Sequence, residues 1–141
     1  MLKQDIKVAA DAIVLAKDNG NTSILLIQRK NDPYKGMWAF PGGFVEDDED
    51  LEPAAIRELK EETGVALEKM EQLRTYGTPG RDPRMRTVSI VFYAIIDKSQ
   101  HIVKADDDAA DARWFDIKTL PPLAFDHDEI MAYALKHIPL S

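Results

Sequence analysis

The hydrophobic positions of the chain fall into a few continuous runs separated by polar turns. Residues 6–17 and 23–29 are rich in Val, Ala, Ile and Leu, which is typical of strands buried on both faces. The segment Asp-Asn-Gly-Asn at residues 18–21 lies between them and predicts a hairpin turn. Residues 88–96 (VSIVFYAII) give the strongest strand pattern, and we expect this strand to be central in a sheet.

Shorter runs predict further strands over residues 38–40, 70–78 and 112–116. In the first of them, Trp38 and Phe40 alternate with Ala39 and therefore share a face. We interpret both rings as core residues rather than as a surface on which a base stacks. Residues 77–84 contain two prolines and two glycines, so this segment is expected to be irregular.

Residues 52–63 have the spacing of an amphipathic helix. Asp50 or Glu52 can cap its start, and Gly64 is a typical residue just past a helix end. The sequence Pro-Gly-Gly at residues 41–43 predicts a turn whose backbone can approach a ligand or this helix closely.

A second helix is expected between Asp126 and Pro139. Asp126 and Glu129 lie three residues apart and resemble a capping box at its start. The buried side of this helix is predicted to contain Ile130, Ala134, Leu135 and Ile138. We interpret His127, in the first turn, as a surface or capping histidine, with contact to the base or ribose of a ligand as the alternative.

The length of 141 residues predicts a single domain over residues 1–141. With 45% hydrophobic and 30% charged residues, the composition is that of an ordinary globular protein. The net charge of −7 argues against generic binding to nucleic acid or to an anionic membrane. The absence of cysteine excludes disulfides, thiol nucleophiles and thiolate metal sites. The chain shows neither a signal-like segment nor a transmembrane run, so we expect a cytoplasmic location.

Three glutamates stand close together on the first predicted helix. Glu58, Glu61 and Glu62 occupy positions i, i+3 and i+4, so their carboxylates are expected to share a face. Like charges at this spacing destabilise a helix, whereas a divalent cation turns the repulsion into attraction. Taken alone, the cluster has a second interpretation, which is a solvated acidic helix face.

Arginines mark two further segments. Arg29 ends the apolar run 23–29, where its charge needs either a cleft with an anion or a surface ion pair. Arg81, Arg84 and Arg86 concentrate positive charge in and just after the irregular segment of an acidic protein. Such a group can clamp a diphosphate through bidentate hydrogen bonds, and the alternative is a solvated loop.

The stretch from residue 43 to residue 65 combines these features in one pattern. It consists of Gly43, five residues, Glu49, seven residues, Arg57-Glu58-Leu59, one residue, Glu61-Glu62, one residue and Gly64-Val65. This pattern resembles a complete Nudix box, with every fixed position matched. The resemblance implies an α/β/α sandwich with a mixed sheet and a catalytic loop–helix. It also implies an enzyme that cleaves nucleoside diphosphates linked to another moiety, with Mg²⁺ or Mn²⁺ as cofactor.

Mapped onto this sequence, the resemblance makes Glu58 and Glu62 the principal metal ligands. The backbone carbonyl of Gly43 would contact a metal. Glu61 would be a further ligand, or the group that holds or deprotonates the attacking water.

The resemblance assigns other residues to supporting roles. Glu49 and Arg57 would brace the loop against the helix, and we count both among the catalytic residues. One of Asp106, Asp107 and Asp108 would bring an additional carboxylate to the metal, although such a run by itself indicates a solvated loop.

Outside the box, residues 76–84 and 123–135 resemble short bacterial ADP-ribose pyrophosphatases. Pro79 lies within a residue or two of the position at which such members tend to have a proline. The implied reaction is hydrolysis of ADP-ribose to AMP and ribose 5-phosphate. The residues expected to bind the substrate are Arg29, Arg81, Arg84, Arg86 and His127.

The resemblance leaves other functions open. The same box would serve an enzyme that removes oxidised nucleoside triphosphates, or one that hydrolyses dinucleoside polyphosphates. A third alternative is an ADP-ribose-sensing domain without catalytic activity, as in Nudix-related transcriptional regulators. The expected partner is a small nucleotide, and many ADP-ribose pyrophosphatases are dimers, so a homodimer is among the expectations.

Overall fold

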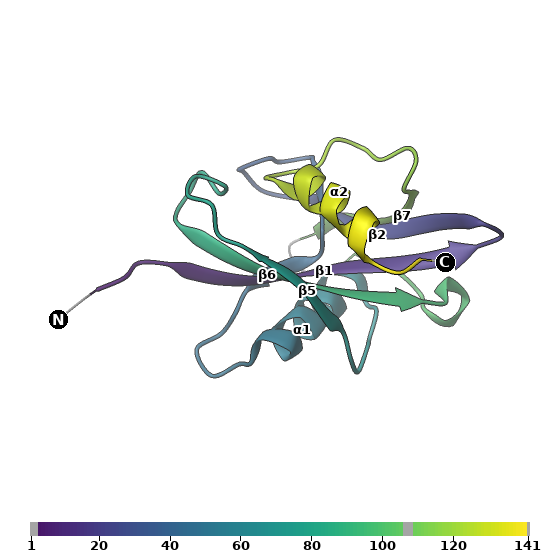
Figure 1. Cartoon of the computed structure of the whole chain (residues 1–141), viewed down its shortest axis with the longest axis horizontal. Helices are drawn as coiled ribbons and strands as arrows, with labels where there is room; N and C mark the ends of the chain where they lie inside the picture. The colour runs from purple at the N-terminus through teal and green to yellow at the C-terminus, as the bar shows by residue number, and fades with distance from the viewer. Residues whose placement is uncertain (1–2, 106–108, 141) are drawn as a thin grey trace.

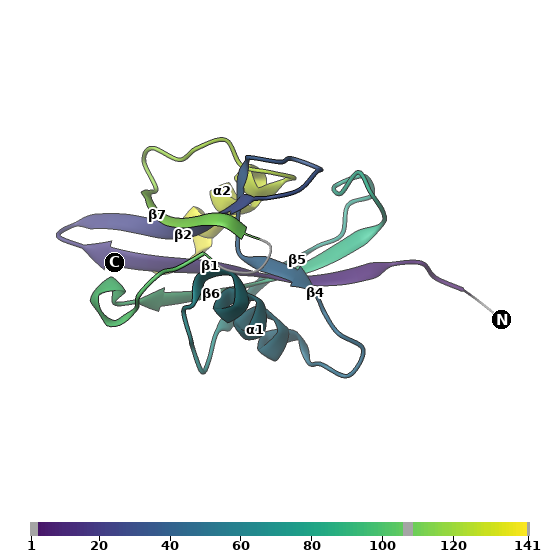
Figure 2. The same ribbon diagram turned by 180° about the vertical axis from the view of Figure 1, so that it is seen from behind.

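A mixed β-sheet with one helix on each face forms the centre of the computed structural model, which describes residues 3–105 and 109–140 (Figures 1 and 2). The elements in chain order are β1 (Lys7–Asp18), β2 (Asn21–Arg29), β3 (Trp38–Ala39), β4 (Gly42–Phe44), α1 (Leu51–Thr63), β5 (Glu71–Tyr76), β6 (Thr87–Ile96), a 3-10 turn (Lys98–Gln100), β7 (Ala109–Asp116) and α2 (His127–His137). The sheet and the two flanking helices confirm the predicted α/β/α class.

The sheet is built around β1. Its main path runs β3-β2-β1-β6-β5, while β4 pairs with β1 and β7 pairs with β2. Strand β6 runs parallel to β1 over ten residue pairs, and β2 and β4 run antiparallel to it. The central position predicted for residues 88–96 is therefore confirmed.

Alternation along β1 divides the core into two layers. Ala12 and Val14 face α1, where they join Leu59 in one hydrophobic cluster. Ile13 and Leu15 face α2 and pack in a second cluster that contains Ile130 of that helix. Successive side chains of a strand point to opposite faces, so a strand covered on both sides is apolar throughout.

Three local predictions are wrong. Residues 42–44 form strand β4 against β1 rather than part of a turn, although the close approach to a helix is confirmed below. Leu135 is 38% exposed, and Met131 takes a buried place on α2 instead. Asp126 is the residue at the start of α2, but its carboxylate makes no capping hydrogen bond and pairs with Arg81.

The described residues include no helix that is long and apolar enough to cross a membrane.

Candidate active site

Helix α1 is set by local sequence at both ends. The carboxylate of Asp50 accepts a hydrogen bond from the Leu51 amide at 2.7 Å, which stabilises the start of the helix. Gly64 has a φ of 78°, a left-handed conformation that glycine adopts easily, and its amide donates to the Lys60 carbonyl. These contacts confirm the cap and the stop predicted from the sequence.

A pocket of about 440 Å³ lies between this helix, the sheet and the start of α2. Carboxylates, arginines and aromatic rings line it together. The lining residues include Asp11, Glu58, Glu62, Arg29, Arg81, Arg84, Phe40, Phe44, Phe125 and His127. The pocket therefore offers groups suited to a cation beside groups suited to an anion.

Glu58 and Glu62 are the two carboxylates of α1 that line the pocket. Glu62 is 7% exposed, and its Oε1 accepts a hydrogen bond from the Gly42 amide at 2.7 Å. Burial raises the pKa of Glu58, against the opposing effect of Arg57. A methyl group added to Gly43 would lie 2.6 Å from the Glu58 carboxyl carbon, so a larger residue at this position would displace that carboxylate.

Glu61 lies apart from these two. Its side chain is 44% exposed, pairs with Arg57 at 3.2 Å and is absent from the pocket lining. Two glutamates of the predicted three therefore face the pocket, and the third flanks it. Over residues 3–105 and 109–140, no three acidic or histidine side chains are arranged as a ready metal site.

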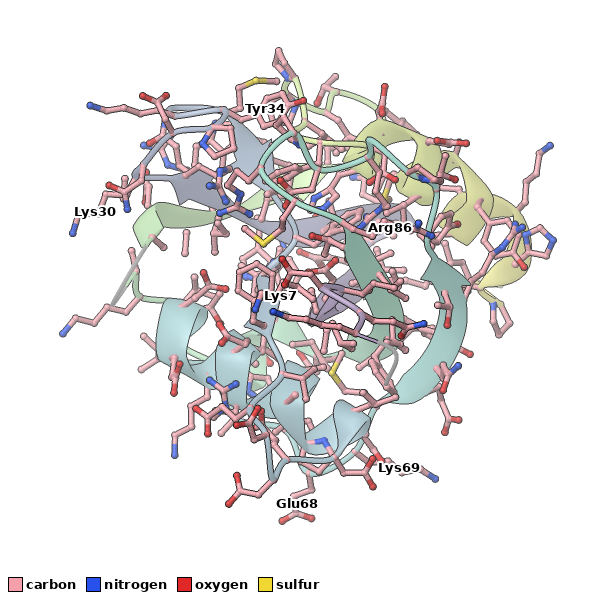
Figure 3. All side chains as sticks on the ribbon, turned by 90° about the vertical axis from the view of Figure 1, so that its left-hand side faces the viewer. Lys7, Lys30, Tyr34, Glu68, Lys69 and Arg86 are labelled. Carbon is pink, nitrogen blue, oxygen red and sulfur yellow. The ribbon has the colours of Figure 1, made fainter. Side chains whose placement is uncertain are left out.

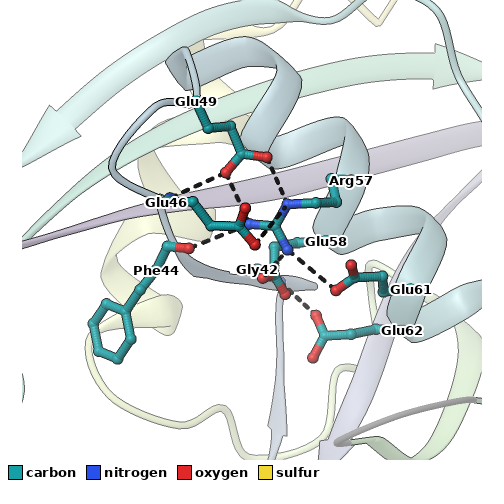
Figure 4. Close-up of polar contacts among 8 residues, drawn as sticks. All are labelled: Gly42, Phe44, Glu46, Glu49, Arg57, Glu58, Glu61 and Glu62. Atoms are coloured by element: carbon teal, nitrogen blue, oxygen red, sulfur yellow. Dashed lines mark hydrogen bonds and ion pairs between the residues drawn. The ribbon is translucent and has the colours of Figure 1, made fainter.

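Arg57 connects the loop before α1 to the glutamates of the helix (Figure 4). Its guanidinium donates to both oxygens of Glu49, at 2.5 and 2.9 Å, and to the Phe44 carbonyl at 3.3 Å. It also donates to Glu58 at 2.9 Å. Its hydrogen bond lowers the pKa of Glu49 and raises that of Arg57. The predicted bracing of the loop by Glu49 and Arg57 is present in the structure.

Two arginines of the 77–86 region reach the pocket. Arg81, with 5% of its side chain exposed, donates to both Asp126 oxygens at 2.9 and 2.8 Å and to Ser89 at 2.7 Å. Arg84 pairs with Asp82 at 2.9 Å. The alternative of a solvated loop does not describe Arg81, whereas the Arg84 side chain is 37% exposed.

The other two predicted arginines differ from each other. Arg29 lines the pocket, and its Nε donates to the Pro33 carbonyl at 2.7 Å. Arg86 donates to the Gly77 carbonyl at 2.9 Å and is not part of the lining. In Figure 3 it lies across this end of the molecule from Lys30, a pocket-lining residue. Arg86 follows the loop and begins the approach to β6, so the structure does not bring it to the site.

His127 is buried rather than on the surface, and that interpretation is wrong. It is 5% exposed, its ring stacks on Phe40 with centroids 4.4 Å apart, and its Nδ1 accepts from the Phe40 amide at 3.2 Å. Burial lowers the pKa of His127 to about 3. The ring is therefore neutral at physiological pH and forms one wall of the pocket.

Asp11 is a pocket residue that the sequence interpretation missed. It sits in the middle of β1 with 7% exposure, and burial raises its pKa to about 7 against the opposing effect of Arg81. The signal was a single acidic residue inside the apolar run 8–16. Burying a charge is costly, so an acid in such a run indicates a cleft or a partner. The carboxylates predicted at residues 106–108 lie outside the described residues.

Opposite pKa shifts at Asp11 and His127 lead to a test of stability. Between about pH 4 and 6.5, folding takes up a proton at Asp11, whose ordinary pKa is 3.8, and releases one at His127, whose ordinary pKa is 6.5. Acid therefore stabilises the fold through the first group and destabilises it through the second, and the effects offset each other.

We expect Asp11→Asn to remove this balance. On acidification from pH 6 to 4.5, the free energy of unfolding of the variant should fall by about 1.4 kcal/mol per pH unit relative to that of the wild type. This is the contribution of one proton. Urea unfolding at several pH values, with chelator present, measures the difference in slope. Parallel stability curves for the two proteins would contradict the assignment.

The fold and pocket define a class: an α/β/α sandwich whose loop–helix presents paired carboxylates opposite arginines. A family model described as NUDIX domain matches residues 5–136. The chain is 51% identical over 124 residues to an ADP-ribose pyrophosphatase of Methanocaldococcus jannaschii, covering 88% of this chain and 70% of that one. It is 33% identical over 135 residues to the ADPR responsive transcriptional repressor NtrR of Acinetobacter baylyi, covering 93% of this chain and 54% of the repressor.

Solved structures agree with this result. A MutT/nudix family protein from Enterococcus faecalis superposes with a TM-score of 0.89 at 30% identity, covering 98% of this chain and 64% of that one. The NUDIX domain of Shewanella oneidensis NrtR, solved in complex with ADP ribose, superposes with a TM-score of 0.88 at 30% identity. The match covers 98% of this chain and 91% of that one. The chain belongs to the NUDIX domain family.

Proposed function

We propose that the protein hydrolyses ADP-ribose to AMP and ribose 5-phosphate with the help of a divalent cation. The observation that carries this proposal is the 51% identity to an ADP-ribose pyrophosphatase over 88% of the chain. A pocket with buried carboxylates beside arginines supports it, because a linked diphosphate needs charge neutralisation and orientation.

The donor set fits a hard cation. Glu58 and Glu62 offer carboxylate oxygens to the same pocket. Gly43 also lines it, and because it has no side chain, its backbone lies close to the Glu58 carboxylate. Burial raises the pKa of Glu58, and a nearby cation favours the ionised form of such a group. When bound, Mg²⁺ or Mn²⁺ would neutralise phosphate charge and lower the pKa of a water ligand.

The chain's own residues would position the substrate. Arg29, Arg81 and Arg84 supply donors along the arginine side of the pocket, where the diphosphate oxygens would bind. Water attacks one phosphorus, the bond from that phosphorus to the bridging oxygen breaks, and the water protons pass to the product phosphates. The carboxylates of Glu58 and Glu62 line the same pocket and would be able to accept a proton from that water.

A second candidate function is the sensing of ADP-ribose without cleavage. The 33% identity to a transcriptional repressor over 93% of the chain favours it. The complete set of box glutamates in this sequence favours hydrolysis. A NUDIX domain that binds ADP-ribose tightly but releases no AMP would fit the sensor.

A substrate panel is the direct test. We expect the highest kcat/KM with ADP-ribose, compared with 8-oxo-dGTP, diadenosine polyphosphates and NADH, in the presence of Mg²⁺ or Mn²⁺. Release of AMP and ribose 5-phosphate, resolved by chromatography, identifies the cleaved bond. Release of pyrophosphate from 8-oxo-dGTP as the main activity would support the sanitising function instead. A preference for diadenosine polyphosphates would support the dinucleoside polyphosphate hydrolase.

The remaining expectations belong to the same proposal. We propose a cytoplasmic protein that acts on a small nucleotide and has no nucleic-acid partner, with a homodimer as one expectation for its oligomeric state. Light scattering after size-exclusion chromatography measures the oligomeric state. A DNA-binding assay is informative because the similar protein NrtR from Shewanella oneidensis has been solved with a 27mer DNA.

A further inference from the structure

The ring of Phe125 contacts two arginines of the pocket. The Arg29 guanidinium carbon is 4.9 Å from the centroid of its ring, and that of Arg84 is 5.7 Å away. Arg29 comes from the end of β2, whereas Arg84 comes from the loop before β6. One aromatic ring thus contacts two cations from separate parts of the chain.

The backbone of Phe125 is held in an uncommon conformation. Its φ is 54°, in the left-handed region that bulky residues rarely adopt. Hydrogen bonds lie on both sides of it, from the Ala124 amide to the Trp38 carbonyl at 2.8 Å and from the His127 amide to the Ala124 carbonyl at 3.1 Å. Such a conformation persists where the surroundings impose it, and it occurs preferentially at ligand sites.

The ring has further fixed neighbours. The ring of Tyr34 packs against it in an edge-type contact with centroids 4.8 Å apart. Arg84 also lies over Phe44, with 5.7 Å from its guanidinium carbon to that ring. Arg84 is therefore held by two rings, whereas Arg29 contacts one of them. An aromatic face attracts a cation, so the ring offsets repulsion between two guanidinium groups placed near it.

We propose that Phe125 is a positioning residue of this pocket, whose ring holds Arg29 and Arg84 as a pair directed at the diphosphate of the substrate. The inference rests on the proposed function, because it assigns the anion side of that site. Neighbouring Asp126 holds Arg81 by a different contact, a pair of hydrogen bonds to its carboxylate. The entry to α2 thus contacts three of the pocket's arginines, Arg29, Arg81 and Arg84, while Arg57 is held by Glu49 and Glu58.

The first test separates a positioning role from a structural one. Phe125→Leu should raise the KM for ADP-ribose about tenfold with kcat within about threefold, because ordered charges bind the ground and transition states alike. Phe125→Tyr keeps the ring and should stay within about twofold of wild type. Phe125→Asn suits the left-handed backbone without a ring, so it should resemble the Leu variant even if Leu folds poorly. A loss confined to kcat would overturn the inference.

A double-mutant cycle is the sharper test. In an Arg84→Ala background, Phe125→Leu should raise KM only about threefold, because one of its two cations is already gone. Phe44→Leu is the matched control, since that ring contacts Arg84 but not Arg29, and it should raise KM about threefold in the wild type. Fully additive effects of Phe125→Leu and Arg84→Ala would show that the ring does not act through the arginine.

Binding of inorganic pyrophosphate separates this inference from the proposed function. Calorimetry without added metal should show a Kd about tenfold weaker for Phe125→Leu than for the wild type. This result would support the inference even if the substrate panel rejects ADP-ribose. Equal affinities, or no measurable binding to the wild type, would overturn it whichever nucleotide is cleaved.

Discussion

Glu62→Gln is expected to lower the rate of metal-dependent ADP-ribose hydrolysis at least about a hundredfold while the fold persists. Glu62 is buried and lines the pocket beside Glu58, and the substitution removes one of the two negative charges that α1 places there. The amide oxygen of Gln can still accept the hydrogen bond from the Gly42 amide. Stability should therefore change little, and steady-state kinetics with thermal unfolding measures both properties.

Glu61→Gln is the matched control on the same helix. Its side chain is 44% exposed, pairs with Arg57 and is not part of the pocket lining, so we expect a loss of activity of less than about tenfold. Equal losses in the two variants would restore the arrangement predicted from helical spacing, in which all three glutamates serve the metal. Turnover near wild type for Glu62→Gln would refute the metal-site assignment.

The features that the sequence predicted well depend on neighbours along the chain. The start of α1 at Asp50 and its end at Gly64 follow from capping, which acts over a single turn. The two-sided burial of β1 follows from a continuous apolar run. The pairing of Arg57 with Glu49 could be anticipated because both lie in one loop–helix pattern.

Features that depend on distant residues could not be predicted in this way. Asp126 has the spacing of a capping residue, but the fold places Arg81 against it from 45 positions away. A bidentate contact with a buried guanidinium is stronger than a hydrogen bond to a helix amide, so tertiary structure overrides the local preference. His127 is buried for the same reason, because Phe40 of the opposite segment stacks on it.

Gly43→Ala is expected to lower activity about as much as Glu62→Gln, because it displaces a carboxylate rather than removing one. The added methyl would lie 2.6 Å from the Glu58 carboxyl carbon and 2.7 Å from both of its oxygens. These atoms end a flexible side chain, so the fold can adapt by moving the carboxylate out of its place. We expect a loss of at least about a hundredfold in kcat/KM with a small change in stability, because misplacing a catalytic group by about 1 Å has such effects.

Two other glycines give the controls for Gly43→Ala. At Gly77, a methyl would meet only Val88 side-chain carbons at 3.4 and 4.0 Å, so Gly77→Ala should keep near-wild-type activity. At Gly42, it would lie 2.7 Å from the Ala10 carbonyl oxygen, which is backbone and cannot move aside alone. Gly42→Ala should therefore destabilise the fold itself, as urea unfolding would show. An active and stable Gly43→Ala enzyme would mean that the carboxylate of Glu58 has no fixed place in the reaction, whereas loss of activity with an intact fold would locate the chemistry at the contact between β4 and α1.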